Sequence, residues 1–241
     1  MSSNIMLVRA LILAVLWAIV PQVCAQSLAI VPIRQDLSSA HRSASFTLTN
    51  TSDSPALIQI RSYSWIQKGN DDSFIASDKL TVSPPFATLA PGKSQTVRLL
   101  LRSPATNGEE SYRIVFDQIP DRLGNKVQLT LRFTVPVFSA GSTPGHADVQ
   151  WRIERQGDNL TLVAVNRGLA HSMLTGLNAT TVGGEALKLV GPGMPYILAG
   201  SERRWIINDP HHVLNTGSRV HVVNPGPRNK SDQWVNVGPN H

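Results

Sequence analysis

The segment Lys126–Phe138, "KVQLTLRFTVPVF", carries the most regular pattern in the chain. Its odd positions are all apolar: Val127, Leu129, Leu131, Phe133, Val135 and Val137. Its even positions from 126 to 134 are Lys, Gln, Thr, Arg and Thr. Strict alternation predicts a β-strand with one apolar face. At about 3.3 Å per residue the apolar row would be roughly 35 Å long, whereas a typical strand has only about five or six residues. The question is what so long a row contacts.

Shorter strand patterns surround this segment. "SASFTLTN" (43–50) and "ALIQIRSYSWIQ" (56–67) alternate in the same way, and the turn-forming stretch "NTSDSP" (50–55) joins them. The chain has 17 glycines and 16 prolines, and after residue 25 it shows no amphipathic helical pattern of ten residues or more. Regular short strands with turn signals predict an all-β sandwich architecture.

Two domains of similar size are predicted. The segment 139–147, "SAGSTPGHA", has no large apolar residue, and we interpret it as a linker. The first domain would then span 26–138, the second would span 148–241, and we expect the polar segment 226–241 to be frayed.

The first 25 residues have the layout of a secretory signal peptide. Arg9 is their only charge, the apolar run "ALILAVLWAIV" (10–20) follows it, and small Ala25 ends the segment. This predicts export with cleavage near Ala25–Gln26. The only cysteine, Cys24, would be removed, so the mature chain could form no disulfide.

Charge and motif content point away from catalysis. The formal net charge is +6, but the basic residues are scattered, which disfavours nucleic acid and membrane surfaces as partners. The seven histidines lack metal-ligand spacing, and nucleophile-elbow and phosphate-loop motifs are absent. We therefore predict no metal, no cofactor and no enzyme activity. The carboxylate pairs Asp71–Asp72 and Glu109–Glu110 are interpreted as solvated turns.

Longer stretches of the sequence resemble a known family. They are "VPIRQDLS" (31–38), "RSASFTLTNTSDSPALIQIRSYSWIQ" (42–67), "LTVSPPFATLAPGKSQTVRLLLR" (80–102) and "SYRIVFDQIP" (111–120). In this order they resemble the PapD-like periplasmic chaperones of the chaperone–usher pathway, and the resemblance continues more loosely through 162–177 and 196–207. It implies two immunoglobulin-like domains set at an angle. It also implies a periplasmic, non-enzymatic function: binding pilus (fimbrial) subunits and delivering them to an outer-membrane usher.

The resemblance also implies roles for particular residues. In donor-strand complementation the last strand of the first domain fills the open core of a subunit by β-augmentation. The donor residues would be Val127, Leu129, Leu131, Phe133 and Val135. An exposed apolar edge of this kind also allows a self-capping homodimer in the free state.

Members of the family hold the subunit's C-terminal carboxylate with two basic residues in the cleft between the domains. Arg34 matches the first of these. The second, a lysine, aligns with Pro136, which is a departure from the family. Arg113 on the neighbouring strand is our candidate replacement, and the alternative is that Arg113 is a surface residue on a solvated strand face.

Three alternatives compete with this interpretation. The apolar row could face the core of its own domain. The chain could be a structural pilus subunit or adhesin, although such a protein has one incomplete sandwich rather than two domains. It could also be an exported carbohydrate-binding sandwich, which would need clustered exposed aromatic residues, whereas the five tryptophans are scattered.

Overall fold

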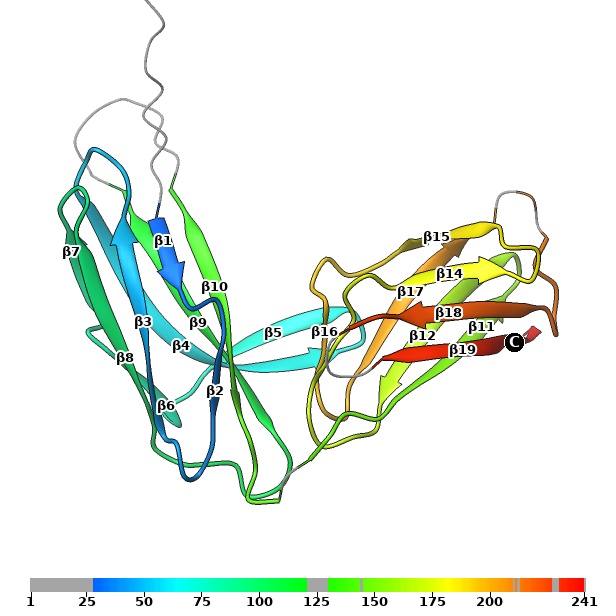
Figure 1. Cartoon of the computed structure of the whole chain (residues 1–241), viewed down its shortest axis with the longest axis horizontal. Coiled ribbons are helices and arrows are strands. Elements are labelled where there is room, and N and C mark those ends of the chain that lie inside the picture. Colours follow the sequence, from blue (N-terminus) through cyan, green and yellow to red (C-terminus); the bar gives the residue numbers. More distant parts are fainter. Residues whose placement is uncertain are drawn as a thin grey trace, which may run out of the picture.

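The computed structural model describes residues 28–120, 130–143, 145–209, 211, 213–226 and 230–240, and all its regular elements are strands. The predicted all-β class is therefore confirmed. Two β-bodies meet at an elbow (Figure 1). The first contains β1 (Leu28–Val31), β2 (Gln35–Leu37), β3 (Ser43–Asn50), β4 (Ala56–Lys68), β5 (Asp71–Ala76), β6 (Leu80–Ser83), β7 (Phe86–Leu89), β8 (Ser94–Leu101), β9 (Glu110–Ile119) and β10 (Arg132–Ser139). The second contains β11 (Val149–Gln156), β12 (Asn159–Asn166), β13 (Ser172–Met173), β14 (Asn178–Thr181), β15 (Ala186–Val190), β16 (Tyr196–Ile197), β17 (Glu202–Asn208), β18 (Arg219–Asn224) and β19 (Ser231–Asn240).

The first body is a sandwich of two sheets. One has the strand order β1-β3-β8-β6, and the other has the order β2-β10-β9-β4-β5, with β7 also pairing with β4. Alternate residues of each strand point inward and form one core, which includes Phe46, Ile58, Leu99 and Phe116. This alternation is the burial pattern expected of packed antiparallel sheets.

The second body is a sandwich whose edges are joined. Its strands form the closed order β11-β12-β17-β15-β14-β18-β19, around a core that includes Leu162, Ile197 and Val222. The C-terminal segment that we expected to fray instead forms β19, which pairs with β18 and in parallel with β11. The reason is that Val235 and Val237 alternate with polar residues and are buried in this core.

A hairpin connects the two bodies. Strand β4 is 13 residues long, and its second half pairs with β5 beyond the region where β4 pairs with β9. Figure 1 shows this hairpin, in cyan, extending from the first body to the second. The hairpin and the end of β10 therefore meet the second body at one junction.

Candidate functional site: the interdomain cleft and the edge of strand β10

An aromatic cluster fills the junction between the two bodies. Trp65 of β4, Phe138 of β10 and Tyr196 of β16 are buried there, with ring centroids 5.6 to 6.1 Å apart. His171 of the second body stacks on Phe138, with ring centroids 3.5 Å and planes 10° apart. Aromatic contacts of this kind add orientation to burial, so the cluster holds the two bodies at a defined angle.

Arg113 is buried against this cluster as a cation. Its guanidinium carbon lies 3.7 Å from the Trp65 ring centroid and 5.7 Å from that of Tyr196, and its Nη2 lies 3.0 Å from Sδ of Met194. Among the described residues no carboxylate forms an ion pair with it, and its Nε is buried without a hydrogen-bond partner. Burial lowers the pKa of Arg113 to about 10, because desolvation disfavours the charged form.

This placement decides between the two interpretations of Arg113. The residue is only 3% exposed, so the interpretation as a surface arginine is wrong. A buried guanidinium that interacts with Asp72 only at a distance, without a direct ion pair, is suited to binding a carboxylate that a partner brings.

Arg34 also lies against this cluster, in the segment between β1 and β2. Its guanidinium lies 5.1 Å from the centroid of the Phe138 ring. It also forms a forked ion pair with Asp36: Nη2 lies 2.7 Å from Oδ1 and 2.9 Å from Oδ2, and Nε lies 3.2 Å from Oδ1. The junction thus brings Arg34 and Arg113 to the same aromatic cluster.

The edge of β10 next to this cluster has backbone groups available for pairing. Strand β10 pairs with β9 along its whole length, but it pairs with β2 only from Val137 to Ser139. The Gln118 N–H donates to the Leu131 carbonyl. Since bonded pairs alternate in an antiparallel ladder, odd residues of β10 are bonded to β9 and even residues direct their N–H and C=O groups outward. No described strand pairs with Arg132 and Thr134 on this outer side, and Pro136 sits where an N–H would face outward.

The apolar row of β10 is divided between two environments. Val135 is 6% exposed and Val137 is fully buried in the first body's own core, and Phe133 packs against that core. The prediction that Val135 fills a partner's groove is therefore corrected, because this side chain is buried in the sandwich that carries it, whereas Phe133 is only partly buried. Leu131 is only partly buried. Val127 and Leu129 lie outside the described residues.

Polar contacts between the bodies surround the cluster. Asp72 of β5 accepts hydrogen bonds from Arg203 of β17, with Nη2 at 2.7 and 2.8 Å from its two oxygens, and from the Trp65 indole at 2.7 Å. Burial alone would raise the pKa of Asp72, but hydrogen bonds from Arg203, Trp65 and Gln67 outweigh it and hold that pKa below its ordinary value.

Two side-chain amides of the β4–β5 hairpin form pairs of hydrogen bonds with the backbone of the second body, in the pattern that a neighbouring strand would form. Gln67 donates to the Tyr196 carbonyl and accepts from the Leu198 N–H, at 3.1 and 2.8 Å. Asn70 does the same with the backbone of Arg204, at 2.8 Å in both directions. A short side-chain amide thus replaces a peptide group, so the hairpin docks on the second body without adding a strand to its sheet.

The interpretation of Asp72, Glu109 and Glu110 as residues of solvated turns was wrong, whereas Asp71 is exposed. Asp72 belongs to the junction, and Glu109 contacts His171 of the second body, with Oε1 2.6 Å from Nδ1 and 3.0 Å from the His171 backbone nitrogen. Glu110 contacts Lys79 and the Tyr112 hydroxyl. A signal in the sequence existed for Asp72: it falls across a short turn from Trp65 and Gln67, which share one face of β4.

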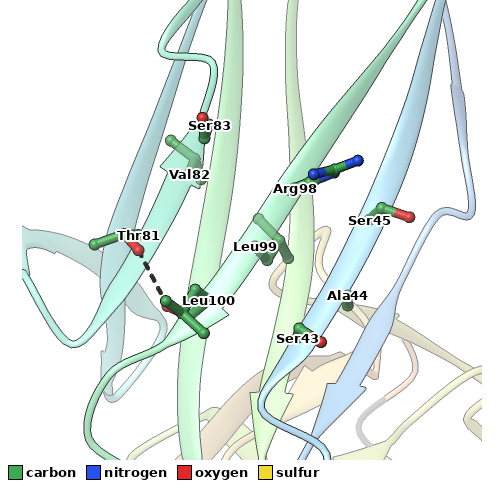
Figure 2. Close-up of a pocket in the computed structure, with 9 residues that line it drawn as sticks. All are labelled: Ser43, Ala44, Ser45, Thr81, Val82, Ser83, Arg98, Leu99 and Leu100. Atoms are coloured by element: carbon green, nitrogen blue, oxygen red, sulfur yellow. Dashed lines mark hydrogen bonds between the residues drawn. The ribbon is translucent and has the colours of Figure 1, made fainter.

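One hollow of the first body lies away from the cleft. It has a volume of about 570 Å³ and lies on the β3-β8-β6 side of the first sandwich, where Figure 2 shows its lining residues on these three strands, with Arg98, Leu99 and Leu100 on the middle one. Among the described residues, no three His, Cys, Asp or Glu side chains gather in a way that could hold a metal ion. The part of the chain that the structure describes also contains no helix of the length and apolarity that crossing a bilayer requires.

Comparisons with known proteins agree with this architecture. Residues 27–142 match the family model described as "Pili and flagellar-assembly chaperone, PapD N-terminal domain". No curated protein matches the sequence.

Solved structures share the fold over both bodies. A chain of the CsuC–CsuE chaperone–tip adhesion subunit complex of Acinetobacter baumannii superposes with a TM-score of 0.66 and 22% identity, over 87% of this chain and 98% of that one. The chaperone YadV gives a TM-score of 0.60 with 16% identity, over 87% of this chain and 99% of that one. The E. coli chaperone DraB gives 0.57 with 20% identity, over 88% of this chain and 96% of that one. The predicted PapD-like fold is confirmed. Residues 27–142 thus belong to the PapD N-terminal domain family, and the two bodies together share the fold of these pilus chaperones.

Proposed function

We propose that this chain is a periplasmic chaperone that captures pilus subunits at the edge of β10 and holds their C-terminal carboxylate in the interdomain cleft. The family is one of chaperones, not enzymes. The observation that carries the proposal is the buried Arg113 guanidinium, which has no direct ion pair among the described residues and lies next to a part of β10 that no described strand pairs on its outer side. Solved relatives include chaperones in complex with a tip adhesion subunit and with the SafA pilin of Salmonella enterica.

The chemistry of the cleft supports two roles. A subunit strand can pair with the outward N–H and C=O groups of Arg132 and Thr134 by β-augmentation. Its terminal carboxylate can then accept charge-assisted hydrogen bonds from Arg34 and Arg113, which would fix the register of that pairing. Leu131, with Val127 and Leu129 before it, would fill the subunit's open core, while Phe133 and Val135 keep their places in the first sandwich.

Export and delivery complete the proposal. Residues 1–25 act as a signal peptide cleaved near Ala25–Gln26, and a domain of residues 26–138 is joined by the linker 139–147 to a domain of residues 148–241. The loaded chaperone passes its subunit to an outer-membrane usher, and the free chaperone caps its donor strand in a homodimer.

A thiol-protection experiment tests capture. The mature chain has no cysteine of its own, so Leu131→Cys and Ser94→Cys each introduce a single thiol. Ser94 is exposed at the start of β8 in the other sheet. In complexes purified from periplasm with a pilus subunit, the thiol at 131 should resist maleimide while the thiol at 94 reacts. Equal reaction at both sites, or the absence of any co-purified pilus subunit, would contradict the proposal.

A further inference from the structure

The Arg34 guanidinium, which the proposed function assigns to a subunit's terminal carboxylate, already forms an ion pair with Asp36. Three nitrogen–oxygen distances of 2.7 to 3.2 Å connect the two side chains, in the forked geometry typical of arginine–carboxylate pairs. The Arg34 side chain is 21% exposed and that of Asp36 is 51% exposed. Asp36 is thus a carboxylate of the chain itself that is bound to the guanidinium where the subunit's terminal carboxylate is expected.

The backbone explains why Asp36 is in this position. In the parallel pairing of β2 with β10, Asp36 lies directly beside Phe138. The Arg34 guanidinium lies over the Phe138 ring on one side, and His171 stacks on the same ring. The Asp36 carboxylate therefore holds the Arg34 cation over an aromatic face that the junction keeps in place.

We infer that Asp36 is a placeholder carboxylate, which occupies Arg34 in the free chaperone and is displaced by the terminal carboxylate of the captured subunit. This inference rests on the proposed function. Because a guanidinium fork that is already paired must exchange one carboxylate for another, Asp36 lowers the affinity for a subunit's C-terminus. Half of the Asp36 side chain is open to water, so the displaced carboxylate returns to solvent and is not left buried without a partner. The consequence is capture that is specific for a terminal carboxylate yet weak enough to be reversed.

The test compares two probe peptides on four proteins. The probes are an acetylated ten-residue peptide of alternating valine and threonine with a free terminal carboxylate, and the same peptide with a terminal amide. The proteins are the wild type, Arg34→Ala, Asp36→Asn, and Asp78→Asn as a control that makes the same charge change at an exposed loop residue. We expect Asp36→Asn to bind the carboxylate probe about threefold to tenfold more tightly than the wild type, and the amide probe with unchanged affinity.

Failure of the inference and failure of the proposed function give different results. If the wild type and Arg34→Ala prefer the carboxylate probe over the amide equally, Arg34 is not the anchor and the proposed function fails. If Arg34→Ala loses the preference but Asp36→Asn does not strengthen it, Asp36 orients Arg34 and the placeholder role is overturned. Tighter binding of both probes by Asp36→Asn, or the same gain in Asp78→Asn, would show a general charge effect and would also overturn it.

Discussion

Arg203 of the second body forms a two-pronged ion pair with Asp72 of the first, and the Arg203 side chain is completely buried. Its Nε also lies 3.2 Å from the Tyr196 carbonyl. A buried charge that loses its partner is costly, whereas replacing both members of a pair by apolar groups is often neutral. The angle between the bodies therefore depends on two residues that are far apart in the sequence.

We expect Arg203→Met and Asp72→Leu each to lower the free energy of unfolding by about 3 kcal/mol, and the double variant to recover most of that loss. Each single variant leaves one member of the pair without its partner, and the double variant removes both members. Urea denaturation followed by tryptophan fluorescence measures the effect, since Trp65 reports from the junction itself. Additive losses in the double variant would mean that the two residues act independently.

From the same ion pair we predict that the free energy of unfolding depends on pH in the acid range. The pKa of Asp72 is held below its ordinary value in the folded chain, so the stability that its carboxylate contributes is present above about pH 4 and is lost as the pH falls through the lowered pKa. Unfolding free energies measured from pH 6 to pH 2 should fall more steeply for the wild type than for Asp72→Asn. Parallel curves would contradict this assignment, and Asp78→Asn, changed in an exposed loop, should follow the wild type.

Arg34→Ala should abolish subunit capture and leave the fold intact. Arg34 is partly exposed and pairs with an exposed carboxylate, so the loss of that pair should cost the free chain about 1 kcal/mol or less. The measurement combines recovery of pilus subunit from periplasm with the thermal midpoint of the purified chaperone. Normal recovery with the variant would remove Arg34 from the site.

Arg113→Met should weaken subunit capture without lowering the stability of the free chain. Methionine keeps an apolar stem against Trp65 and Tyr196 but removes a charge whose burial lowers the pKa to about 10. The free energy of unfolding should be unchanged or higher by about 1 kcal/mol, while subunit binding weakens at least tenfold. A variant that binds the subunit with wild-type affinity would show that the Arg113 cation is not used in capture.

The sequence predicted this junction only in part, for physical reasons. Alternation identified the apolar row that ends in β10, but a period of two cannot distinguish residues that pack in the chain's own core from residues that would pack in a partner's core, so Val135 was assigned to the wrong one. The family motif located Arg34, and strand adjacency located Arg113. The pairing of Asp72 with Arg203 joins residues 131 positions apart, and no local pattern encodes such a contact.

The final prediction compares two positions of the same apolar row. Val135→Glu should unfold the first body, because a carboxylate without a partner in the core costs several kcal/mol. Leu131→Glu should leave the free chaperone folded, since Leu131 is only partly buried and precedes the part of the row that packs in the core. It should nevertheless fail to hold a subunit, whose open core would have to accept the charge. Thr130→Glu, of opposite parity and exposed, is the matched control and should be mild in both respects. Circular dichroism melts and subunit pull-down distinguish the outcomes. If Leu131→Glu showed no cooperative melting transition, the strand would serve its own fold at position 131 as well, and the donor role of the row would lose its support.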